Sequence, residues 1–439
     1  MATLTSSSAN ESDNYLVSKP QAWFAFAMTF VLMLFDYIDR QVIVSLFPYI
    51  KADWGLSDKQ LGSLVSIISI VVAAGSIPVA LLADRFSRVK SIFVMAATWS
   101  AATISCMFAG NYSQLFAARA VVGVGETGYG SVGAALIATL FPKRLRGALL
   151  GAFFAAGSLG AVLGVVLGGV IAAKWGWQAA FGVVGVPGLL LALAYLLVKD
   201  YKTVSLTPEL NQVTQSMGKT LAHIYKTLVS TKTLLWLCLG GAMQLIVVSA
   251  VWSWLPSFLN RYYGVVPEMA AKQAALVVLL GALGSFIWGF VVDRISSKSA
   301  RKKLPALAVL CITTMIVLLT AFGAVAPGDL QFKLILLGGF FMTCTVGVVS
   351  GLTIDVVHPG VRSTGSAVLA LFQNLFGLAV GPFLIGVLSD AWGLNQALSA
   401  VPVFCSLAAL FFMLAARTYE ADASKAEQAA TVSGQVSAH

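Results

Sequence analysis

Long apolar segments follow one another through this chain from residue 22 to residue 417, and they leave few folds open to it. A helix that crosses a membrane needs about 20 predominantly apolar residues, and each segment meets that length. Only 10% of the residues are charged, whereas soluble domains carry roughly a quarter. We therefore predict an all-α integral membrane protein with twelve transmembrane helices. The predicted spans are residues 22–48, 58–82, 91–109, 112–141, 146–173, 178–198, 233–262, 268–292, 304–325, 330–355, 362–390 and 395–417.

Two polar segments divide the chain, and both are rich in Lys, Ser, Thr and Gln. The predicted parts are a cytoplasmic N-terminal segment, a six-helix bundle, a cytoplasmic linker, a second six-helix bundle and a cytoplasmic tail. Their boundaries are 1–21, 22–198, 199–232, 233–417 and 418–439. The composition of the tail is typical of disordered segments.

The basic residues predict the orientation of the chain, because cytoplasmic loops of membrane proteins carry an excess of Lys and Arg. Most of the 28 Lys and Arg residues fall in the termini, the linker and the loops that we place in the cytoplasm. Both termini are therefore expected to be cytoplasmic. The same bias explains the net charge of +10 without a nucleic-acid partner. The short termini and compact loops favour the inner membrane of a bacterium.

An acidic-basic pair recurs at the same place in each predicted bundle. Asp84-Arg85 ends the second span, and Asp293-Arg294 ends the eighth. Two related six-helix halves, with the substrate near the midplane between them, are an architecture of secondary transporters. The repeat therefore predicts two pseudo-symmetric bundles of such a transporter.

Two glycine-rich stretches resemble nucleotide-binding motifs but lack their context. Residues 123–128 read Gly-Val-Gly-Glu-Thr-Gly, yet they lie inside an apolar helical run rather than after a strand. Residues 218–220 read Gly-Lys-Thr, but Val213 stands where a P-loop requires its first glycine. The five cysteines lack metal-ligand spacing. We therefore expect no metal and no organic cofactor, a chain that is not an enzyme, and transport driven by an ion gradient or by the gradient of the substrate.

Five ionisable residues fall at membrane depth. The first span contains Asp36, Asp39 and Arg40, and the fourth contains Arg119 and Glu126. Each such residue costs roughly 2.5–3.5 kcal/mol on insertion scales, so it is a functional candidate by default. Residues four apart share a helix face, and residues seven apart lie two turns along one face. The two helices are therefore expected to present acids and bases to each other.

Three acids against two bases leave one carboxyl group that can hold a proton. We interpret Glu126 as the leading proton carrier, with Asp39 second and Asp36 as a further coupling residue. Guanidinium groups suit carboxylate or phosphate, so Arg40 and Arg119 are expected to hold an anionic head group. The alternative interpretation is that these residues form permanent ion pairs that only hold two helices together.

The second half of the chain offers aromatic and uncharged polar side chains instead. A charged first half and an apolar second half favour an amphipathic ligand, although single aromatic residues more often pack or face lipid. The further residues assigned to substrate binding are Tyr129, Gln244, Trp252 and Asn374.

The residues after the second span resemble the signature of the major facilitator superfamily, which reads roughly G-x-x-x-D-R-x-G-R. Residues 80–88 read Ala-Leu-Leu-Ala-Asp-Arg-Phe-Ser-Arg, so both glycines are replaced. The resemblance implies the major facilitator fold, and a latch in which a carboxylate near a helix N-terminus steadies one state of an alternating-access cycle. Such a contact contributes typically 0.3–1 kcal/mol. A solvated turn is the alternative. The residues assigned to the latch are Asp84, Arg85, Arg88, Asp293 and Arg294.

Within that superfamily the chain resembles the Spinster group of lysolipid and sphingosine-1-phosphate transporters. The matching runs are Tyr-Ile-Asp-Arg at 37–40, residues 119–126 with 136–141, Trp-Leu-Pro-Ser-Phe-Leu at 254–259, and Gly-Pro-Phe-Leu-Ile-Gly at 381–386. Asp36 departs from the group, which tends to have Asn. The chain also resembles the anion:cation symporters in the Asp-Arg of the first helix and the Gly-x-Gly-Glu of the fourth. That group tends to continue with Ala-Gly-Asn-Phe-Pro, where residues 127–131 read Thr-Gly-Tyr-Gly-Ser.

The resemblance implies a secondary transporter, proton-coupled, that moves an anionic amphiphile such as a lysophospholipid or a sphingosine-1-phosphate-like lipid. The alternative is a proton symporter of sugar acids or other small carboxylates, and a third alternative is a drug/proton antiporter. The expected partners are protons, the substrate and membrane lipids, with the chain as a monomer.

Overall fold

The computed structural model describes residues 15–85, 87–200, 231–296, 299–357 and 362–436. Twelve of its helices are long and apolar enough to cross a membrane, which confirms the predicted number of spans. The described residues form helices and connecting turns without a β-strand. Most of the linker predicted at 199–232 lies outside the described residues.

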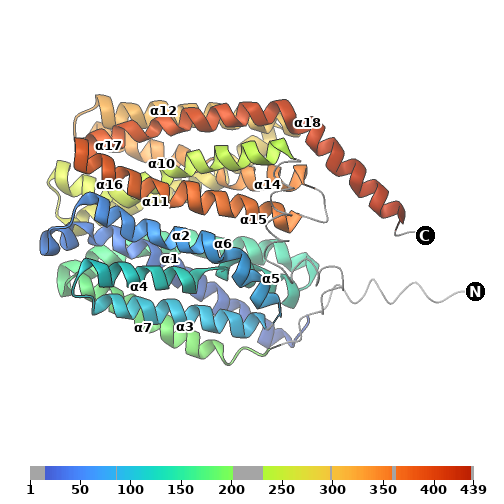
Figure 1. Ribbon diagram of the computed structural model, residues 1–439, viewed down its shortest axis with the longest axis horizontal. Coiled ribbons are helices and arrows are strands. Elements are labelled where there is room, and N and C mark those ends of the chain that lie inside the picture. Colours follow the sequence, from blue (N-terminus) through green and yellow to red (C-terminus); the bar gives the residue numbers. More distant parts are fainter. Residues whose placement is uncertain (1–14, 86, 201–230, 297–298, 358–361, 437–439) are drawn as a thin grey trace, which may run out of the picture. The chain divides into compact units, whose positions relative to one another are not determined.

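The described residues of the first half, 15–85 and 87–200, form seven α-helices. Helices α3, α4 and α7 run side by side (Figure 1). The bounds are α1 Lys19–Trp54, α2 Asp58–Arg85, α3 Arg88–Met107, α4 Tyr112–Glu126, α5 Tyr129–Leu140, α6 Lys143–Trp175 and α7 Trp177–Tyr195.

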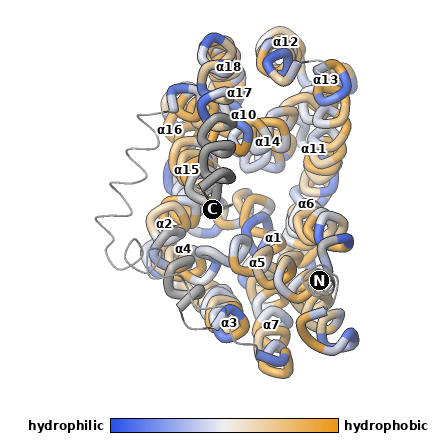
Figure 2. Tube along the Cα trace, turned by 90° about the vertical axis from the view of Figure 1, so that its right-hand side faces the viewer, coloured by the Kyte–Doolittle hydropathy of each residue, from blue (hydrophilic) through white to orange (hydrophobic). Residues whose placement is uncertain are grey.

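The described residues of the second half form α-helices that short 3-10 and π-helical turns interrupt. Helix α18 packs against both α10 and α12 (Figure 1). The bounds are α10 Lys232–Tyr263, α11 Pro267–Ile295, η2 Ala300–Lys302, α12 Lys303–Leu319, η3 Thr320–Ala324, α13 Asp329–Met342, α14 Val346–Val356, α15 Arg362–Phe372, η5 Gln373–Leu378, α16 Val380–Trp392, α17 Leu394–Ala400, η6 Val401–Val403 and α18 Phe404–Val436. Figure 2 shows that apolar residues cover much of the helical trace in both halves.

Contacts between residues divide the chain into two compact units. Unit 1 comprises Met1–Leu46 and Gly75–Ser205, and unit 2 comprises Phe47–Ala74 and Leu206–His439. Helices α1 and α2 therefore each belong to both units. Residues 47–74 pack with the second unit although they lie early in the sequence.

Glycines on α6 allow close packing against α1 inside unit 1. A Cβ atom on Gly160 would lie 2.9 Å from the Cβ of Tyr37, and one on Gly164 would lie 2.6 Å from the carbonyl oxygen of Ile38. Small residues let helix backbones approach closely in membranes, where packing rather than the hydrophobic effect holds helices together. This contact fixes the rotation of α1 and therefore the direction of its charged side chains.

The predicted span 112–141 is not one continuous helix. Helix α4 ends at Glu126, and α5 begins at Tyr129. Gly128 between them has φ of 81°, a left-handed conformation that glycine adopts at little cost. The break places Glu126 in the last turn of α4, where the regular backbone ends.

The C-terminal tail corrects a prediction. Residues 418–439 were expected to be disordered, yet α18 continues to Val436. The physical reason is local propensity, because residues 420–430 are dominated by Ala, Glu, Lys and Gln, which favour helices.

Candidate functional site

Helices α1 and α4 bring all five intramembrane charges together within unit 1. Asp36 and Arg40 are one turn apart on α1, and Glu126 lies at the end of α4. Two cross-helix ion pairs result, one between Arg40 and Glu126 and one between Arg119 and Asp39. The expectation that the two helices present acid to base is confirmed.

Arg40 lies between two carboxylates. Its Nε atom is 2.9 Å from Oε2 of Glu126 and 3.6 Å from Oδ2 of Asp36. The Arg40 side chain is 20% exposed, whereas the side chains of Asp36 and Glu126 are 4% and 0% exposed. Its guanidinium also lies over the ring of Tyr37, at 5.6 Å from the centroid. Arg40 is therefore the most accessible of the five charged groups.

Arg119 and Asp39 form a second, fully enclosed pair. The Nη1 atom of Arg119 lies 3.3 Å from Oδ1 of Asp39 and donates to the backbone carbonyl of the same residue at 3.3 Å. Thr103 on α3 donates a hydrogen bond to the other carboxylate oxygen of Asp39. Arg119 is 0% exposed and Asp39 is 1% exposed. The Nε and Nη2 atoms of Arg119 have no hydrogen-bond partner among the described residues.

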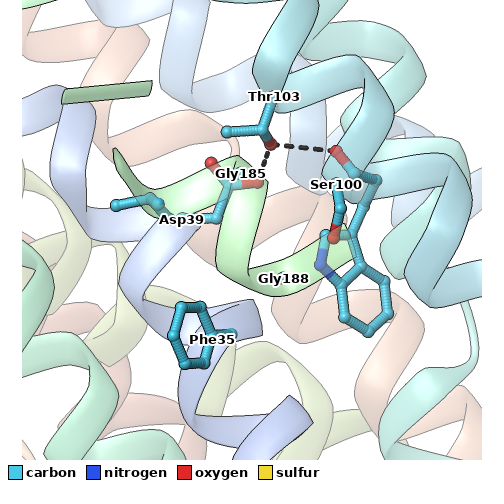
Figure 3. Close-up of a pocket in the computed structure, with 8 residues that line it drawn as sticks. Phe35, Asp39, Ser100, Thr103, Gly185 and Gly188 are labelled. Atoms are coloured by element: carbon cyan, nitrogen blue, oxygen red, sulfur yellow. Dashed lines mark hydrogen bonds between the residues drawn. The ribbon is translucent and has the colours of Figure 1, made fainter. Parts of the chain in front are cut away.

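A narrow pocket adjoins this second pair (Figure 3). The sequence did not single out Thr103, although a polar residue in the apolar run of α3 was a signal that could have done so. Ser100, one turn earlier on α3, is 1% exposed, and its hydroxyl has no hydrogen-bond partner among the residues that the structure describes. The residues that line the pocket are Phe35, Asp39, Trp99, Ser100, Thr103, Val184, Gly185 and Gly188.

Around Arg40, several buried polar atoms have no hydrogen-bond partner in the described part of the chain. They include Oδ1 of Asp36, Nε of Arg40 and both carboxylate oxygens of Glu126. The contact between Arg40 and Glu126 is therefore an ion pair without hydrogen-bond geometry. Buried polar groups in proteins are nearly always hydrogen-bonded, and exceptions point to strain, a functional role or a bound water or ion. The charge cluster around Arg40 is therefore a candidate functional site.

Tyr129 lies close to this cluster but is engaged in packing. Its hydroxyl donates to the carbonyl of Thr29 at 2.6 Å, and the residue is 1% exposed. Its ring packs edge-on against Trp99, with the ring centroids 5.0 Å apart. The predicted contact between Tyr129 and substrate stays a prediction.

The other residues assigned to substrate binding all lie in unit 2. Gln244 is 0% exposed, and its Nε2 donates to the carbonyl of Met342 at 2.9 Å. Within the described ranges its Oε1 has no hydrogen-bond partner. The indole nitrogen of Trp252 has none either. Asn374 lies in the π-helical turn Gln373–Leu378, and its amide donates to the carbonyl of Ala370 at 2.9 Å. Such turns are frequent at functional sites.

The residues assigned to a latch are only partly described. Asp84 and Arg85 end α2, and their side chains lie outside the described part of the structure. Arg88 donates to the hydroxyl of Thr139 at 2.9 Å. Asp293 forms an ion pair with Lys303 at 2.7 Å, and Arg294 is exposed. The latch remains a prediction.

Twelve apolar helices and a buried charge cluster define the class of protein as an integral, multi-pass membrane transporter. Residues 29–382 match the sequence pattern of the Major Facilitator Superfamily. The chain therefore belongs to that superfamily, and it is a transporter rather than an enzyme.

Known relatives cover most of the chain. It is 24% identical over 395 residues to the hexuronate transporter of Bacillus subtilis (strain 168), covering 88% of this chain and 93% of the relative. It is 26% identical to protein spinster of Drosophila melanogaster over 395 residues, which is 84% of this chain and 62% of the relative. The relatives thus include a Spinster protein and a transporter of a small organic anion, the two groups that the sequence resembles.

A solved structure shares the fold. It is a bacterial homolog of the human lysosomal transporter Spinster, in an inward-facing and unoccupied conformation. The TM-score is 0.81 at 23% identity, covering 92% of this chain and 99% of the other. The major facilitator fold predicted from the sequence is confirmed.

Proposed function

We propose that this protein couples proton movement to transport of an anionic substrate across a bacterial inner membrane, with Arg40 as the anion contact and Glu126 as the proton carrier. The observation that carries the proposal is the position of Arg40. It is the most accessible charge of the cluster, and buried carboxylates of Asp36 and Glu126 flank it at 3.6 and 2.9 Å. A guanidinium in this position can pair with the carboxylates of Asp36 and Glu126 or with an anionic substrate that reaches it.

The coupling follows from the charge of the cluster. Three carboxylates and two guanidinium groups sum to a net charge of −1 when all are ionised. A proton on Glu126 brings the net charge of the cluster to zero. It also removes the negative charge with which Glu126 competes against the substrate for Arg40. An anionic substrate then takes its place, because guanidinium pairs well with carboxylate or phosphate. Proton and anion therefore bind together, which is the condition for symport.

Arg119 and Asp39 have a supporting role in this proposal. Arg119 is 0% exposed and paired with Asp39. A direct contact between Arg119 and substrate would need that pair to open first. We assign Arg119 to hold the carboxylate of Asp39 in place, with Asp39 and Asp36 as further groups that can take a proton.

The substrate class that we favour is an anionic amphiphile, such as a lysophospholipid or a sphingosine-1-phosphate-like lipid. The similarity to spinster proteins supports this class. The second candidate class is small organic anions such as sugar acids. The similarity to a hexuronate transporter supports it. So do Gln244 and Asn374, whose amides suit the hydroxyl groups of a sugar acid.

Uptake into liposomes distinguishes the classes. The purified protein is reconstituted and given lysophospholipids, sugar acids or cationic dyes, with and without a pH gradient. We expect accumulation of an anionic compound that depends on the gradient. Accumulation of the dyes alone would contradict the assignment of an anionic substrate. Transport of hexuronates without lysolipids would select the second candidate class.

Two variants test the assigned roles. Arg40→Gln should weaken binding of the anionic substrate at least about tenfold, since charge-assisted bonds are worth about 1.5–3 kcal/mol. Glu126→Gln should stop accumulation against a gradient while exchange of substrate across the membrane continues. Lys272→Gln, which removes an exposed charge from unit 2, is the matched control and should leave both unchanged. Gradient-driven accumulation by Glu126→Gln would overturn the coupling assignment.

A further inference from the structure

The hydroxyl of Thr103 on α3 lies between two acceptors inside unit 1. It is within hydrogen-bond distance of Oδ2 of Asp39, and it lies 2.9 Å from the backbone carbonyl oxygen of Trp99, one turn earlier on the same helix. Thr103 is 0% exposed and Asp39 is 1% exposed. Figure 3 shows the side chain of Thr103 directed toward the carboxylate of Asp39. One hydroxyl group therefore has two buried oxygens to which it can donate.

A hydroxyl group has one hydrogen to donate and two lone pairs that accept, so Thr103 donates to only one of these oxygens at a time. When Asp39 is ionised, its carboxylate receives the hydrogen bond, because bonds to a charged acceptor are roughly twice as strong as neutral ones. When Asp39 carries a proton on Oδ2, that O–H donates to Thr103, and Thr103 turns its own hydrogen to the carbonyl of Trp99. Oδ2 of Asp39 thus keeps a hydrogen bond in both protonation states.

Close packing on two sides holds α3 in place at this point. A Cβ atom on Gly125 of α4 would lie 2.8 Å from the Cα of Trp99, and one on Gly188 of α7 would lie 2.7 Å from Oγ of Ser100. A threonine hydroxyl in a helix commonly bonds a carbonyl three or four residues earlier, so the contact with Trp99 is an ordinary one. Thr103 therefore reaches both oxygens from a helix that its neighbours fix in position.

The other two acids of the charge cluster lack such a neighbour. Both carboxylate oxygens of Glu126 and Oδ1 of Asp36 have no hydrogen-bond partner among the residues for which the structure gives contacts. Asp39 differs, because Oδ1 receives a hydrogen bond from Arg119 and Oδ2 receives one from Thr103. A proton on Oδ2 therefore leaves the contact of Arg119 with Oδ1 in place.

Ionisable groups face Asp39 from three helices. They are Asp36 and Arg40 on α1, Cys106 on α3, and Arg119 and Glu126 on α4. Helix α7 lines the adjoining pocket with valine and glycine only. Among the described residues, Thr103 is the one that bonds Oδ2 of Asp39. The charged neighbours influence whether Asp39 holds a proton, and Thr103 determines where that proton lies.

We propose that Thr103 is a positioning residue for a proton on Asp39, and that its hydroxyl reverses the direction of their hydrogen bond when the proton binds. In this step the proton forms a bond with Oδ2 of Asp39, the new O–H donates to Thr103, and no proton leaves Thr103. The inference rests on the proposed function, because it takes Asp39 as a further group that holds a proton during transport. It adds the oxygen that carries the proton and the residue that accepts its hydrogen bond.

Infrared difference spectra of the reconstituted full-length protein, recorded between low and high pH, test the position of the proton. A protonated carboxyl group gives a C=O stretching band, and the band of Asp39 is the one that Asp39→Asn removes and Glu126→Gln leaves in place. In Thr103→Val a methyl group replaces the hydroxyl, so the O–H of Asp39 loses its acceptor and the band should shift to higher frequency. Thr103→Ser keeps a hydroxyl and should return the band to its parent position.

The matched control is Ser100→Ala, which removes a hydroxyl from the same pocket without a bond to Asp39 and should leave the band unshifted. Thr103→Ala removes the same hydroxyl as Thr103→Val and should give the same shift if the valine variant does not fold. An unshifted band in the variants without the hydroxyl, or no band that depends on Asp39 at any pH, would overturn the proposal. Gradient-driven accumulation by the parent is measured separately, so its absence would overturn the proposed function while the band still decides the role of Thr103.

Discussion

Replacement of Arg119 by Met removes one partner of the enclosed ion pair and keeps the length of the side chain. Arg119 is 0% exposed and contacts both the carboxylate and the backbone carbonyl of Asp39. In the variant, Asp39 keeps only its hydrogen bond from Thr103. It must remain as a poorly compensated buried charge or become neutral by taking a proton.

The outcome with the lower free-energy cost determines how much stability the variant loses. Leaving one charge of a buried pair without its partner costs about 3–5 kcal/mol. Protonation of a carboxyl group costs about 1.4 kcal/mol for each pH unit above its ordinary pKa of ~3.9, or about 4 kcal/mol at pH 7. We expect Arg119→Met to lower the free energy of unfolding by about 3–4 kcal/mol at pH 7. If the proton is taken up, the loss should shrink by about 2.7 kcal/mol between pH 7 and pH 5.

Thermal unfolding of the purified protein in detergent measures this loss. A decrease in Tm of roughly 5–15 °C is expected at pH 7, and a smaller one at pH 5. The double variant Arg119→Met with Asp39→Asn removes both charges and should recover most of the stability, as neutral replacements of buried pairs often do. Stability of the single variant equal to that of the parent at pH 7 would refute the reasoning.

Three other substitutions test the packing and the helix ends by the same measurement. Gly160→Val inserts a side chain between α6 and α1 and should cost about 1–3 kcal/mol. Gly128→Ala places a Cβ atom at φ of 81° and should cost about 1–2 kcal/mol, whereas Gly130→Ala, where a Cβ atom meets open space, should cost nothing. Asp422→Asn weakens the acceptor for the backbone amide of Thr233 at the start of α10 and should cost about 0.5–2 kcal/mol. A Gly128→Ala variant as stable as Gly130→Ala would show that the break after α4 is not strained.

The intramembrane charges could be found from the sequence, but their pairing could not. Hydropathy alone singles out Arg40 and Arg119, because each interrupts an apolar run. Which acid each arginine meets depends on the rotation of α1 against α4. That rotation is set by side-chain packing on other helices, such as the glycines of α6. The sequence therefore left Glu126 with two possible partners, and the structure selects Arg40.

Contacts between distant helices show a harder limit. The ion pair between Asp58 and Arg261 was not predicted, because a single sequence does not reveal contacts between residues about two hundred positions apart. The helical tail is a different case. Its helix-forming residues were visible in the sequence, but its polarity was given more weight than its propensity.

The central claim is that anion binding and proton binding occur together at Arg40 and Glu126. A direct test records the pH of a weakly buffered solution of the purified transporter while the transported anion is added. The account predicts that wild-type protein takes up protons as the anion binds, and that Glu126→Gln binds the anion without this uptake. Anion binding to the wild type without proton uptake, or the same uptake by Glu126→Gln, would contradict it.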